Sequence, residues 1–317
     1  MYSRITGTGG YLPERIMPNS ELEKIVDTSD EWIQTRTGIK QRHIAREDET
    51  TCDMAYEAAL KSIASADIDK DEIDLIVFAT STPDQIYPST ACLLQNRLEI
   101  KNKCAAFDIQ AVCSGFVYAL SIADKFIRSG SATCVLVIGA DCNSKILDWN
   151  DRTTCVLFGD GAGAAILRAS EEPGIYHSQI HADGSYAEML QVPGGICHPN
   201  AEPYVHMRGS EVFKFAVIAM EEIVDDVLHA VNMEKEDIDW LVPHQANQRI
   251  IAATARKLKL PMSKVIMTVQ DHGNTSAASI PLALDIGIRN GQIKPGDLLL
   301  LEAVGGGFTW GAVLLRY

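Results

Sequence analysis

The sequence predicts an α/β protein built from two related halves. Residues 55–80 and 219–245 each indicate a helix, a short linker and a strand, and EIDLIV in the first stretch is answered by DIDWLV in the second. Segments such as CVLVIGA and DLLLLEA are almost continuously apolar, which is typical of strands in sheets that helices cover on both faces. A duplicated order of this kind predicts helices between and around sheets.

Each half continues with a helix, a strand, a second helix and a second strand. In the first half these elements are predicted over 89–99, over 105–109, from after Cys113 to Arg128, and over 133–139. In the second half they are predicted over 247–259, over 265–269, from after Asn274 to Arg289, and over 297–303. Cys113 lies 17 residues before Gly130 and Asn274 lies 17 before Gly291, so we expect both residues at equivalent helix starts.

The best boundary between the halves is ASEEPGI (169–175), which is polar and contains a proline. We therefore divide the chain into an N-terminal half, residues 1–172, and a C-terminal half, residues 173–317. The interface between two duplicated halves is a favoured place for a ligand site. The stretch QVPGGICHPNAEPY (191–204) is expected to be an irregular surface loop.

The composition narrows the classes of function. The chain has 317 residues and a net charge of −14, which argues against nucleic acid and anionic membranes as partners. The N-terminus lacks a secretory signal and no apolar run approaches the roughly 18 residues that span a bilayer, so we expect a cytoplasmic protein. Eight scattered cysteines without a CxxC pair indicate free thiols. We expect no metal site, because no compact zinc spacing joins the nearest candidate ligands, His177, His181, Cys197 and His198.

Cys113 is the candidate nucleophile. It follows the apolar segment 105–109 and precedes Phe116 and Leu120, which begin a pattern of helical spacing. A thiol at a helix N-terminus lies at the positive end of the helix dipole, which favours the thiolate. The alternative is a small buried apolar residue, which is how we interpret most of the other cysteines.

Two polar residues lie at corresponding ends of their elements. His244 ends the predicted strand in PHQANQRI (243–250), and the carboxyl ends of strands are where open α/β folds place ligands. It could be a general acid or base or a hydrogen-bond donor, or it could only satisfy loop carbonyls. Asn274, in DHGNTSAASIPLAL (271–284), could instead be the N-cap of the following helix. The duplicated order is expected to bring both residues near Cys113.

Two glycine-rich stretches have different interpretations. AVGGGFTWG (303–311) could present backbone N–H groups, as an oxyanion hole requires, or could be a tight turn. LFGDGAGAAIL (157–167) imitates a dinucleotide-binding motif but lies in mid-chain, and the acidic residues Glu171 and Glu172 come too soon after it to bind a ribose. We expect the second stretch to be a strand or turn inside the core.

Seven motifs resemble, in the same order, those of the β-ketoacyl-acyl-carrier-protein synthase III family of the thiolase superfamily. The similarity covers essentially the whole chain, and the order Cys, His, Asn is the one this family uses. The motifs are DTSDEWIQTRTGI (27–39), AVCSGF, FGDGAGA, HADGSY, VPHQAN, HGNTSAAS and GGGFTWG. The resemblance implies a thiolase-like fold in which two duplicated α/β halves form layers in the order αβαβα.

The resemblance also implies a reaction. Cys113 would take an acetyl group from acetyl-CoA as a thioester, and malonyl-acyl-carrier-protein would bind next. His244 and Asn274 would donate hydrogen bonds to its thioester carbonyl during decarboxylation, with backbone N–H groups of Cys113 and Gly306 as the oxyanion hole. The product would be acetoacetyl-acyl-carrier-protein, which initiates type II fatty acid synthesis. No cofactor or metal is expected, and the enzyme would be a homodimer.

Further contacts follow from the same resemblance. The residues implied in CoA binding are Thr28, Trp32, Arg36, Arg152, Gly209, Phe213, Ala246 and Asn247. Those implied in carrier-protein binding are Lys214, Gln245, Ala246, Asn247, Gln248, Arg249, Arg256 and Lys257. Tyr87 would close the acyl pocket across the dimer interface. Ser210 and Val304 depart from the asparagine and phenylalanine that the family leads us to expect, which affects the dimensions of the pocket.

Two alternatives compete with this interpretation. The chain could be another thiolase-superfamily acyltransferase that primes a polyketide or other secondary metabolite with a different acyl group. It could also be a cysteine thioesterase or amidase that uses Cys113 and His244, which predicts hydrolysis without a malonyl donor.

Overall fold

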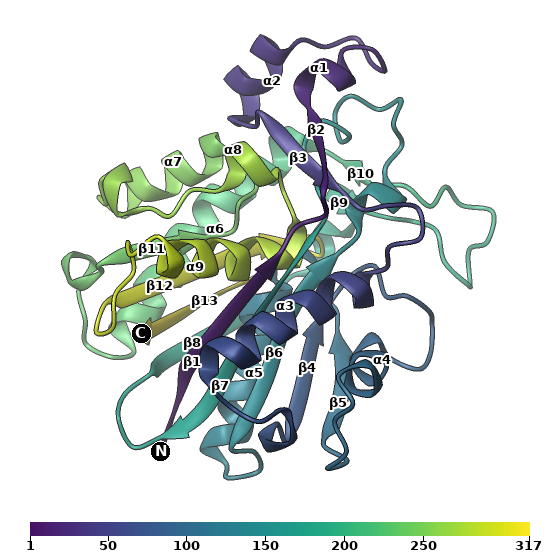
Figure 1. Cartoon of the computed structure of the whole chain (residues 1–317). Coiled ribbons are helices and arrows are strands. Elements are labelled where there is room, and N and C mark those ends of the chain that lie inside the picture. The colour runs from purple at the N-terminus through teal and green to yellow at the C-terminus, as the bar shows by residue number, and fades with distance from the viewer.

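Two β-sheets form the framework of the computed structural model, which describes residues 1–317 (Figure 1). The first sheet has the strand order β1-β7-β6-β4-β5 and the second has the order β11-β12-β13-β8. The strands of the first sheet are β1 (Tyr2–Tyr11), β4 (Leu75–Ala79), β5 (Ala105–Ile109), β6 (Cys134–Asp141) and β7 (Gly161–Ser170). Those of the second are β8 (Ile175–Ala182), β11 (Trp240–Pro243), β12 (Leu298–Gly305) and β13 (Thr309–Arg316).

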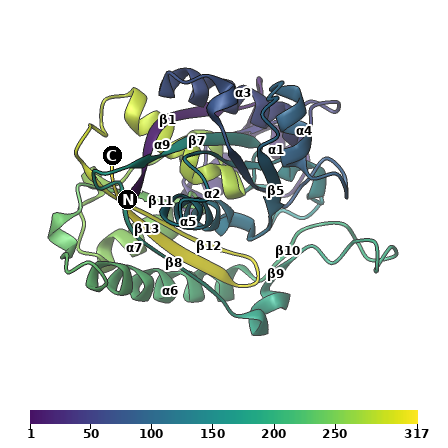
Figure 2. The same cartoon turned by 90° about the horizontal axis from the view of Figure 1, so that it is seen from below.

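Helices cover both faces of each sheet, so that five layers alternate (Figures 1 and 2). One outer layer holds α3 (Thr51–Ala66) and α4 (Thr90–Arg97), which pack on the first sheet. The middle layer holds α5 (Gly115–Arg128) and α9 (Ser279–Arg289), each of which contacts strands of both sheets. The other outer layer holds α6 (Gly209–His229) and α7 (Gln248–Lys257). The predicted layered α/β fold is confirmed.

The continuous apolar strands are explained by burial on both faces. In β6, Val135 and Val137 belong to the core of the middle layer, while Leu136 and Ile138 pack in the separate core beneath α3. All four side chains are fully buried. Successive side chains of a strand point to opposite faces, so a strand with helices on both sides needs apolar residues at every position.

Smaller elements border the two large sheets. The strands β2 (Arg15–Pro18) and β3 (Gln41–Ile44) form an antiparallel pair, and the chain between them holds α1 (Asn19–Leu22) and α2 (Asp30–Thr37). The short helix α8 (Val269–His272) packs on β3. The strands β9 (Leu190–Gln191) and β10 (His206–Met207) form a second antiparallel pair. The predicted irregular loop joins β9 to β10; it is largely exposed and extends from the body of the molecule (Figure 2). No helix has the length and apolar character that a membrane span requires.

Most predicted elements form, but the strand expected over 265–269 does not. Only Val265 makes a bridge, to Leu241, and α8 begins at Val269. The backbone N–H groups of Thr268 and Val269 donate to the side-chain Oε1 of Gln245, at 2.9 and 3.1 Å. The Gln245 side chain therefore accepts the N–H hydrogen bonds of this segment that the backbone of a neighbouring strand was expected to accept.

The expected equivalence of Cys113 and Asn274 holds only approximately. Cys113 lies in the single 3₁₀ turn η2 (Val112–Ser114), directly before α5. Asn274 precedes the corresponding turn η7 (Ser276–Ala278), so it lies outside the start of α9. The prediction that both residues occupy equivalent helix starts is wrong for Asn274.

Candidate active site

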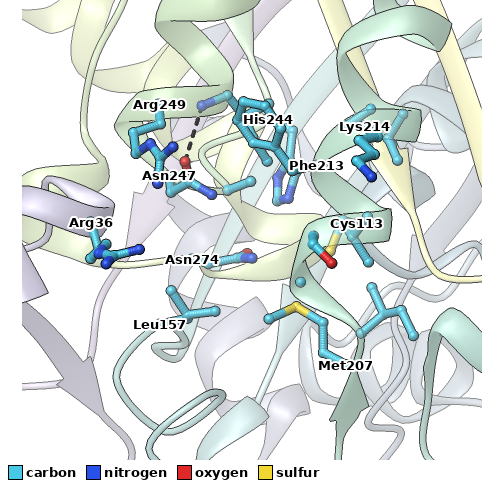
Figure 3. A pocket seen from close by; sticks show the side chains of 18 of the residues that line it. Arg36, Cys113, Leu157, Met207, Phe213, Lys214, His244, Asn247, Arg249 and Asn274 are labelled. Carbon is cyan, nitrogen blue, oxygen red and sulfur yellow. Dashed lines mark hydrogen bonds between the residues drawn. The ribbon is translucent and has the colours of Figure 1, made fainter.

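A cavity of about 550 Å³ opens where the two halves meet (Figure 3). Cys113 comes from the start of α5, His244 from the end of β11 and Asn274 from the segment before η7, and all three line the cavity. Most of the other lining residues are apolar. The apolar walls include Leu157, Phe158, Leu190, Met207, Val212, Ala216, Met220 and Ile250.

Cys113 is 4% exposed and faces this cavity. Burial raises the pKa of its thiol to about 12, and a nearby carboxyl, Asp141, also raises it, while the Ser276 side chain lowers it. The buried environment opposes the helix dipole, because a thiolate loses more solvation than a thiol.

His244 is held in one orientation at the end of β11. Its Nδ1 lies 2.7 Å from the hydroxyl oxygen of Ser279, and its backbone N–H donates to the carbonyl of Glu302 at 2.8 Å. Burial lowers the pKa of His244 to about 3, so the ring is neutral at physiological pH. A neutral imidazole whose Nδ1 is occupied has only Nε2 left to serve a ligand.

Asn274 is oriented by its neighbour in sequence. Its Oδ1 accepts a hydrogen bond from the Ser276 backbone N–H at 2.9 Å. The amide nitrogen makes no hydrogen bond within the chain, and the side chain faces the cavity (Figure 3). The simple N-cap interpretation fails, because the N-cap of α9 is Ala278.

The glycine loop approaches Cys113 closely. A β-carbon added to Gly305 would lie 2.8 Å from the Cys113 backbone nitrogen, and one added to Gly306 would lie 2.9 Å from the Leu190 carbonyl oxygen. Only glycine fits at these two contacts, the first with η2 and the second with β9. The Gly306 N–H has no acceptor within the chain and remains available to a ligand.

Aromatic and basic side chains gather on one side of the opening. The guanidinium carbons of Arg36 and Arg152 lie 5.8 and 5.1 Å from the centre of the Trp32 ring. Arg36 also lines the cavity, and a guanidinium N–H of Arg152 donates to the Asp27 carbonyl at 2.6 Å. The Thr28 hydroxyl is buried without a partner. The predicted CoA residues Gly209, Phe213, Ala246 and Asn247 line the cavity as well.

Helix α7 carries the predicted basic surface. The guanidinium carbon of Arg249 lies 5.6 Å from the centre of the Phe213 ring, and Arg249 lines the cavity together with Lys214. Arg256 is exposed and makes no ion pair. Lys257 is paired with Glu221 of α6 at 2.9 Å, which reduces its free charge. The exposed Gln248 packs against Gly38.

Gln245 does not fit the role of a carrier-protein contact. It is fully buried, and its amide nitrogen donates to the carbonyls of Pro243 and Ile266 at 2.8 and 3.1 Å. Its Oε1 is occupied by the two N–H groups described above. That prediction is wrong, because no polar atom of this side chain is left for a partner.

Three further predicted positions are placed as follows. Ser210 and Val304 line the cavity, so both departures from the family pattern affect its walls. Tyr87 is 83% exposed and does not line the cavity of its own chain.

The structure adds residues that the sequence did not single out. Ser276 and Ser279 belong to the run of small residues after Asn274, and the sequence analysis assigned neither of them a role. Asp141 ends β6 and is completely buried near Cys113. The repeated serines in SAAS were the available signal, since a packing run needs no hydroxyls.

This fold and site define a class of protein. Two α/β halves with a shared middle layer, and a cysteine, a histidine and an asparagine lining one cavity, are the features of a thiolase-like condensing enzyme that transfers acyl groups.

Comparisons with known proteins identify the family. The family model for 3-oxoacyl-[acyl-carrier-protein] synthase III matches residues 107–184, and that for its C-terminal region matches residues 228–317. Beta-ketoacyl-[acyl-carrier-protein] synthase III of Thioalkalivibrio sulfidiphilus is 60% identical over 321 residues, covering 100% of this chain and 99% of the relative. The chain belongs to the β-ketoacyl-acyl-carrier-protein synthase III family.

Solved structures agree with this assignment. The crystal structure of 3-oxoacyl-[acyl-carrier-protein] synthase III from Aquifex aeolicus VF5 matches with a TM-score of 0.95 and 52% identity, over 99% of this chain and 100% of that one. The priming β-ketosynthase of the R1128 polyketide biosynthetic pathway matches with a TM-score of 0.95 and 35% identity, over 99% of this chain and 96% of that one.

Proposed function

We propose that this enzyme condenses acetyl-CoA with malonyl-acyl-carrier-protein, with loss of CO₂, to form acetoacetyl-acyl-carrier-protein. This reaction initiates type II fatty acid synthesis. The observation that carries the proposal is the convergence of Cys113, His244 and Asn274 on one largely apolar cavity. The names of the relatives support the choice of substrates.

In the first step, the Cys113 sulfur attacks the acetyl carbonyl of acetyl-CoA. The new carbon–sulfur bond replaces the bond to CoA, and the thiol proton leaves with the CoA thiolate as CoA-SH. The N–H groups of Cys113 and Gly306 stabilise the tetrahedral oxyanion, and the close packing of the glycine loop on η2 supports this role.

In the second step, malonyl-acyl-carrier-protein enters the same cavity. His244 and the amide nitrogen of Asn274 donate hydrogen bonds to its thioester carbonyl, so that electrons from the breaking carbon–carboxylate bond are held as an enolate. The enolate carbon attacks acetyl-Cys113, and the Cys113 thiolate leaves and takes up one proton. The step is balanced without a cofactor or metal.

Ser279 supports the donor role of His244. When its hydroxyl donates to Nδ1, the single ring proton resides on Nε2, which is the nitrogen available to the substrate. The low pKa of His244 fits this assignment, because a neutral ring can donate from Nε2 only in this tautomer.

The surroundings of the cavity suit the two proposed substrates. The Trp32 ring with Arg36 and Arg152 suits an adenine nucleotide, since it offers a stacking face and phosphate-binding cations. Arg249, Arg256 and Lys214 offer local positive charge to an acidic carrier protein, which would otherwise be repelled by a chain of net charge −14.

We also propose a homodimer in the cytoplasm. Tyr87 and Ile86 are 83% and 71% exposed, which is unusual for two adjacent large apolar side chains. The strand β5 near them forms the edge of the first sheet. In this arrangement the Tyr87 of one subunit closes the acyl pocket of the other.

Mass spectrometry after exposure to acetyl-CoA tests the central claim. One acetyl group should appear on the peptide that contains Cys113 and should be lost when malonyl-acyl-carrier-protein is added, with acetoacetyl-acyl-carrier-protein as the product. Acetyl-CoA hydrolysis without the malonyl donor would instead support a thioesterase. Absence of acetylation at Cys113 would reject the proposed mechanism.

The second candidate function is that of a polyketide-priming synthase. The priming β-ketosynthase of the R1128 pathway, which is 35% identical to this chain, supports this candidate. Val304 lines the cavity and is smaller than the phenylalanine expected there, so it leaves more space for an acyl chain. Competition between acetyl-CoA and longer acyl-CoA primers separates the two, because a preference for the longer primers would favour the second candidate.

A further inference from the structure

Ser276 carries a buried hydroxyl that the steps above do not use. The residue is 1% exposed and adopts a φ of +52°, a backbone conformation that few residues other than glycine occupy. Its hydroxyl forms no hydrogen bond of standard geometry within the chain. A buried hydroxyl without a partner destabilises the folded state, so its retention in the turn η7 calls for a reason.

A buried carboxyl lies beside this turn. Asp141 is fully buried, and its Oδ1 accepts hydrogen bonds from the Ser81 N–H at 2.7 Å and from the hydroxyls of Thr80 and Thr82 at 3.2 and 3.4 Å. Its Oδ2 accepts only one hydrogen bond, from the N–H of Ala277 at 3.1 Å. Oδ2 therefore faces η7 with capacity for one more donor.

The catalytic thiol lies on the other side of the same hydroxyl. The turns η2 and η7, which hold Cys113 and Ser276, pack against each other. The Ser276 side chain is close to both groups, since the next residue, Ala277, donates its N–H to Asp141 Oδ2 at 3.1 Å and η7 packs on η2. The Ser276 side chain also lowers the pKa of Cys113 and of Asp141, which burial raises. The other titratable and charged groups around the thiol are those of the cavity wall, His244, Arg36, Lys214 and Arg249.

We infer that Ser276, supported by Asp141, is the positioning residue for the Cys113 nucleophile. This inference rests on the proposed role of Cys113 as the acyl carrier. While the thiol is protonated, the Ser276 O–H points to Asp141 Oδ2 and its oxygen receives the S–H. When the Cys113 thiolate forms, the hydroxyl rotates and donates to the sulfur. Ser276 gains and loses no proton in this cycle.

The same residue serves Asn274 through a different group. The Ser276 backbone N–H fixes the Asn274 side-chain oxygen at 2.9 Å. Substitution of Ser276 by alanine removes the hydroxyl but keeps this N–H, so the effect on the thiol can be separated from the orientation of Asn274. Ser276→Gly removes the hydroxyl as well, and it relieves the strain of a positive φ.

The test measures the alkylation rate of Cys113 by iodoacetamide as a function of pH, followed on the Cys113 peptide by mass spectrometry. This readout needs no substrate, so it is independent of whether acetyl-CoA is the primer. In Ser276→Ala and Ser276→Gly the alkylation rate should fall about tenfold or more at each pH between about 7 and 9, because a hydrogen bond to the charged sulfur is lost. Acetylation at pH 7 should slow about tenfold, while decarboxylation of malonyl-acyl-carrier-protein changes less.

Thr275→Val is the matched control, because the Thr275 hydroxyl is also fully buried and unpartnered. It should leave the alkylation rate unchanged over the same pH range. The inference is overturned if both Ser276 variants are alkylated at the wild-type rate, or if Thr275→Val slows alkylation equally. Failure of acetylation in the wild type, with the expected loss of alkylation rate in the Ser276 variants intact, would instead reject the proposed function alone.

Discussion

At the scale of single residues, the site separates two chemical tasks. The environment of Cys113, which includes Asp141 and Ser276, affects the pKa of its thiol. The side chains of His244 and Asn274 are each held by one hydrogen bond, and each keeps a nitrogen free for a ligand in the cavity. Burial raises the pKa of the nucleophile and lowers that of the histidine, so neither is charged at rest. An uncharged resting site suits a cavity with apolar walls.

The division of tasks predicts distinct variants. His244→Ala and Asn274→Ala should reduce decarboxylation of malonyl-acyl-carrier-protein by 10²-fold or more, the usual order for removing an oxyanion donor. Both should still allow acetyl-CoA to acetylate Cys113, which mass spectrometry can measure. Cys113→Ser should fail at acetylation, since an alcohol is a far weaker nucleophile at neutral pH. Condensation at the wild-type rate in Asn274→Ala would mean that Asn274 only shapes the local backbone.

The pKa of His244 predicts an unusual pH profile. Because burial lowers this pKa from 6.5 to about 3, the ring stays neutral as the pH falls through 6.5. The rate of malonyl decarboxylation should therefore stay level between pH 8 and pH 5, with circular dichroism used at each pH to confirm folding. A loss of activity with a midpoint near 6.5 would show that the ring titrates normally.

Glu302 offers a third test at this scale. Both of its carboxyl oxygens are buried without partners, and burial raises its pKa to about 8 from 4.5. The folded state therefore binds the proton more tightly, and wild-type stability should fall as the pH rises from 4.5 to 8. Glu302→Gln removes this titration, so its stability relative to wild type should increase with pH, by at most about 1.4 kcal/mol per unit.

Urea unfolding at pH 5.5 and pH 8 measures this difference. Glu14→Gln is the control, because Glu14 is exposed and should show no pH-dependent change. Equal effects of the two substitutions at both pH values would indicate that Glu302 is already ionised in the folded protein.

At the scale of elements, the spacing of apolar residues predicted the helices and strands whose formation depends on their own residues. Strands β5 and β12 and helices α4 and α5 are found within about two residues of their predicted bounds, because their apolar spacing is a property of their own residues. The segment 265–269 failed because Gln245, more than twenty residues away, captures its N–H groups. No periodicity reveals such a contact. The proposed catalytic residues were identified through motifs. Ser276 and Asp141 are far apart in the sequence, and only the fold brings them together, where the neighbouring Ala277 N–H donates to Asp141.

Helix α7 gives the prediction at this scale. Its buried face includes Ile250 and Thr254, and its other face presents Arg249 and Arg256 to solvent. Arg256→Glu should raise the KM for malonyl-acyl-carrier-protein several-fold, while acetylation of Cys113 by acetyl-CoA stays nearly unchanged. Raised salt should weaken carrier binding by the wild type in the same way, because exposed charges are screened over about 10 Å at 0.1 M.

The control for α7 is Lys294→Glu, which makes the same change in net charge at an exposed position that does not line the cavity. It should leave both KM values unaltered. Equal losses in the two variants would assign the effect to the overall charge of the protein, and no loss in Arg256→Glu would mean that this face is only solvated.

At the scale of the whole molecule, the two halves are joined through their middle layer. Helix α9 of the second half packs on β1 and β7 of the first sheet, and α5 of the first half contacts β12 and β13 of the second. This exchange brings Cys113 and Asn274 to the lining of one cavity. Tyr87, the predicted end wall of the acyl pocket, is 83% exposed and does not line this cavity.

Tyr87 therefore predicts how association sets the length of the primer. If a second chain inserts this ring into the acyl pocket, longer primers would overfill it at a cost of about 1–3 kcal/mol, which corresponds to roughly 5- to 150-fold in rate. Wild-type enzyme should use acetyl-CoA and discriminate against octanoyl-CoA by at least this factor. Tyr87→Ala should accept octanoyl-CoA, with sedimentation used to verify that the dimer persists. Ile86→Ala removes the adjacent exposed side chain and should leave the primer range unchanged. Efficient use of octanoyl-CoA by the wild type, or a monomer that discriminates equally well, would place the limit on primer length in the walls of a single chain.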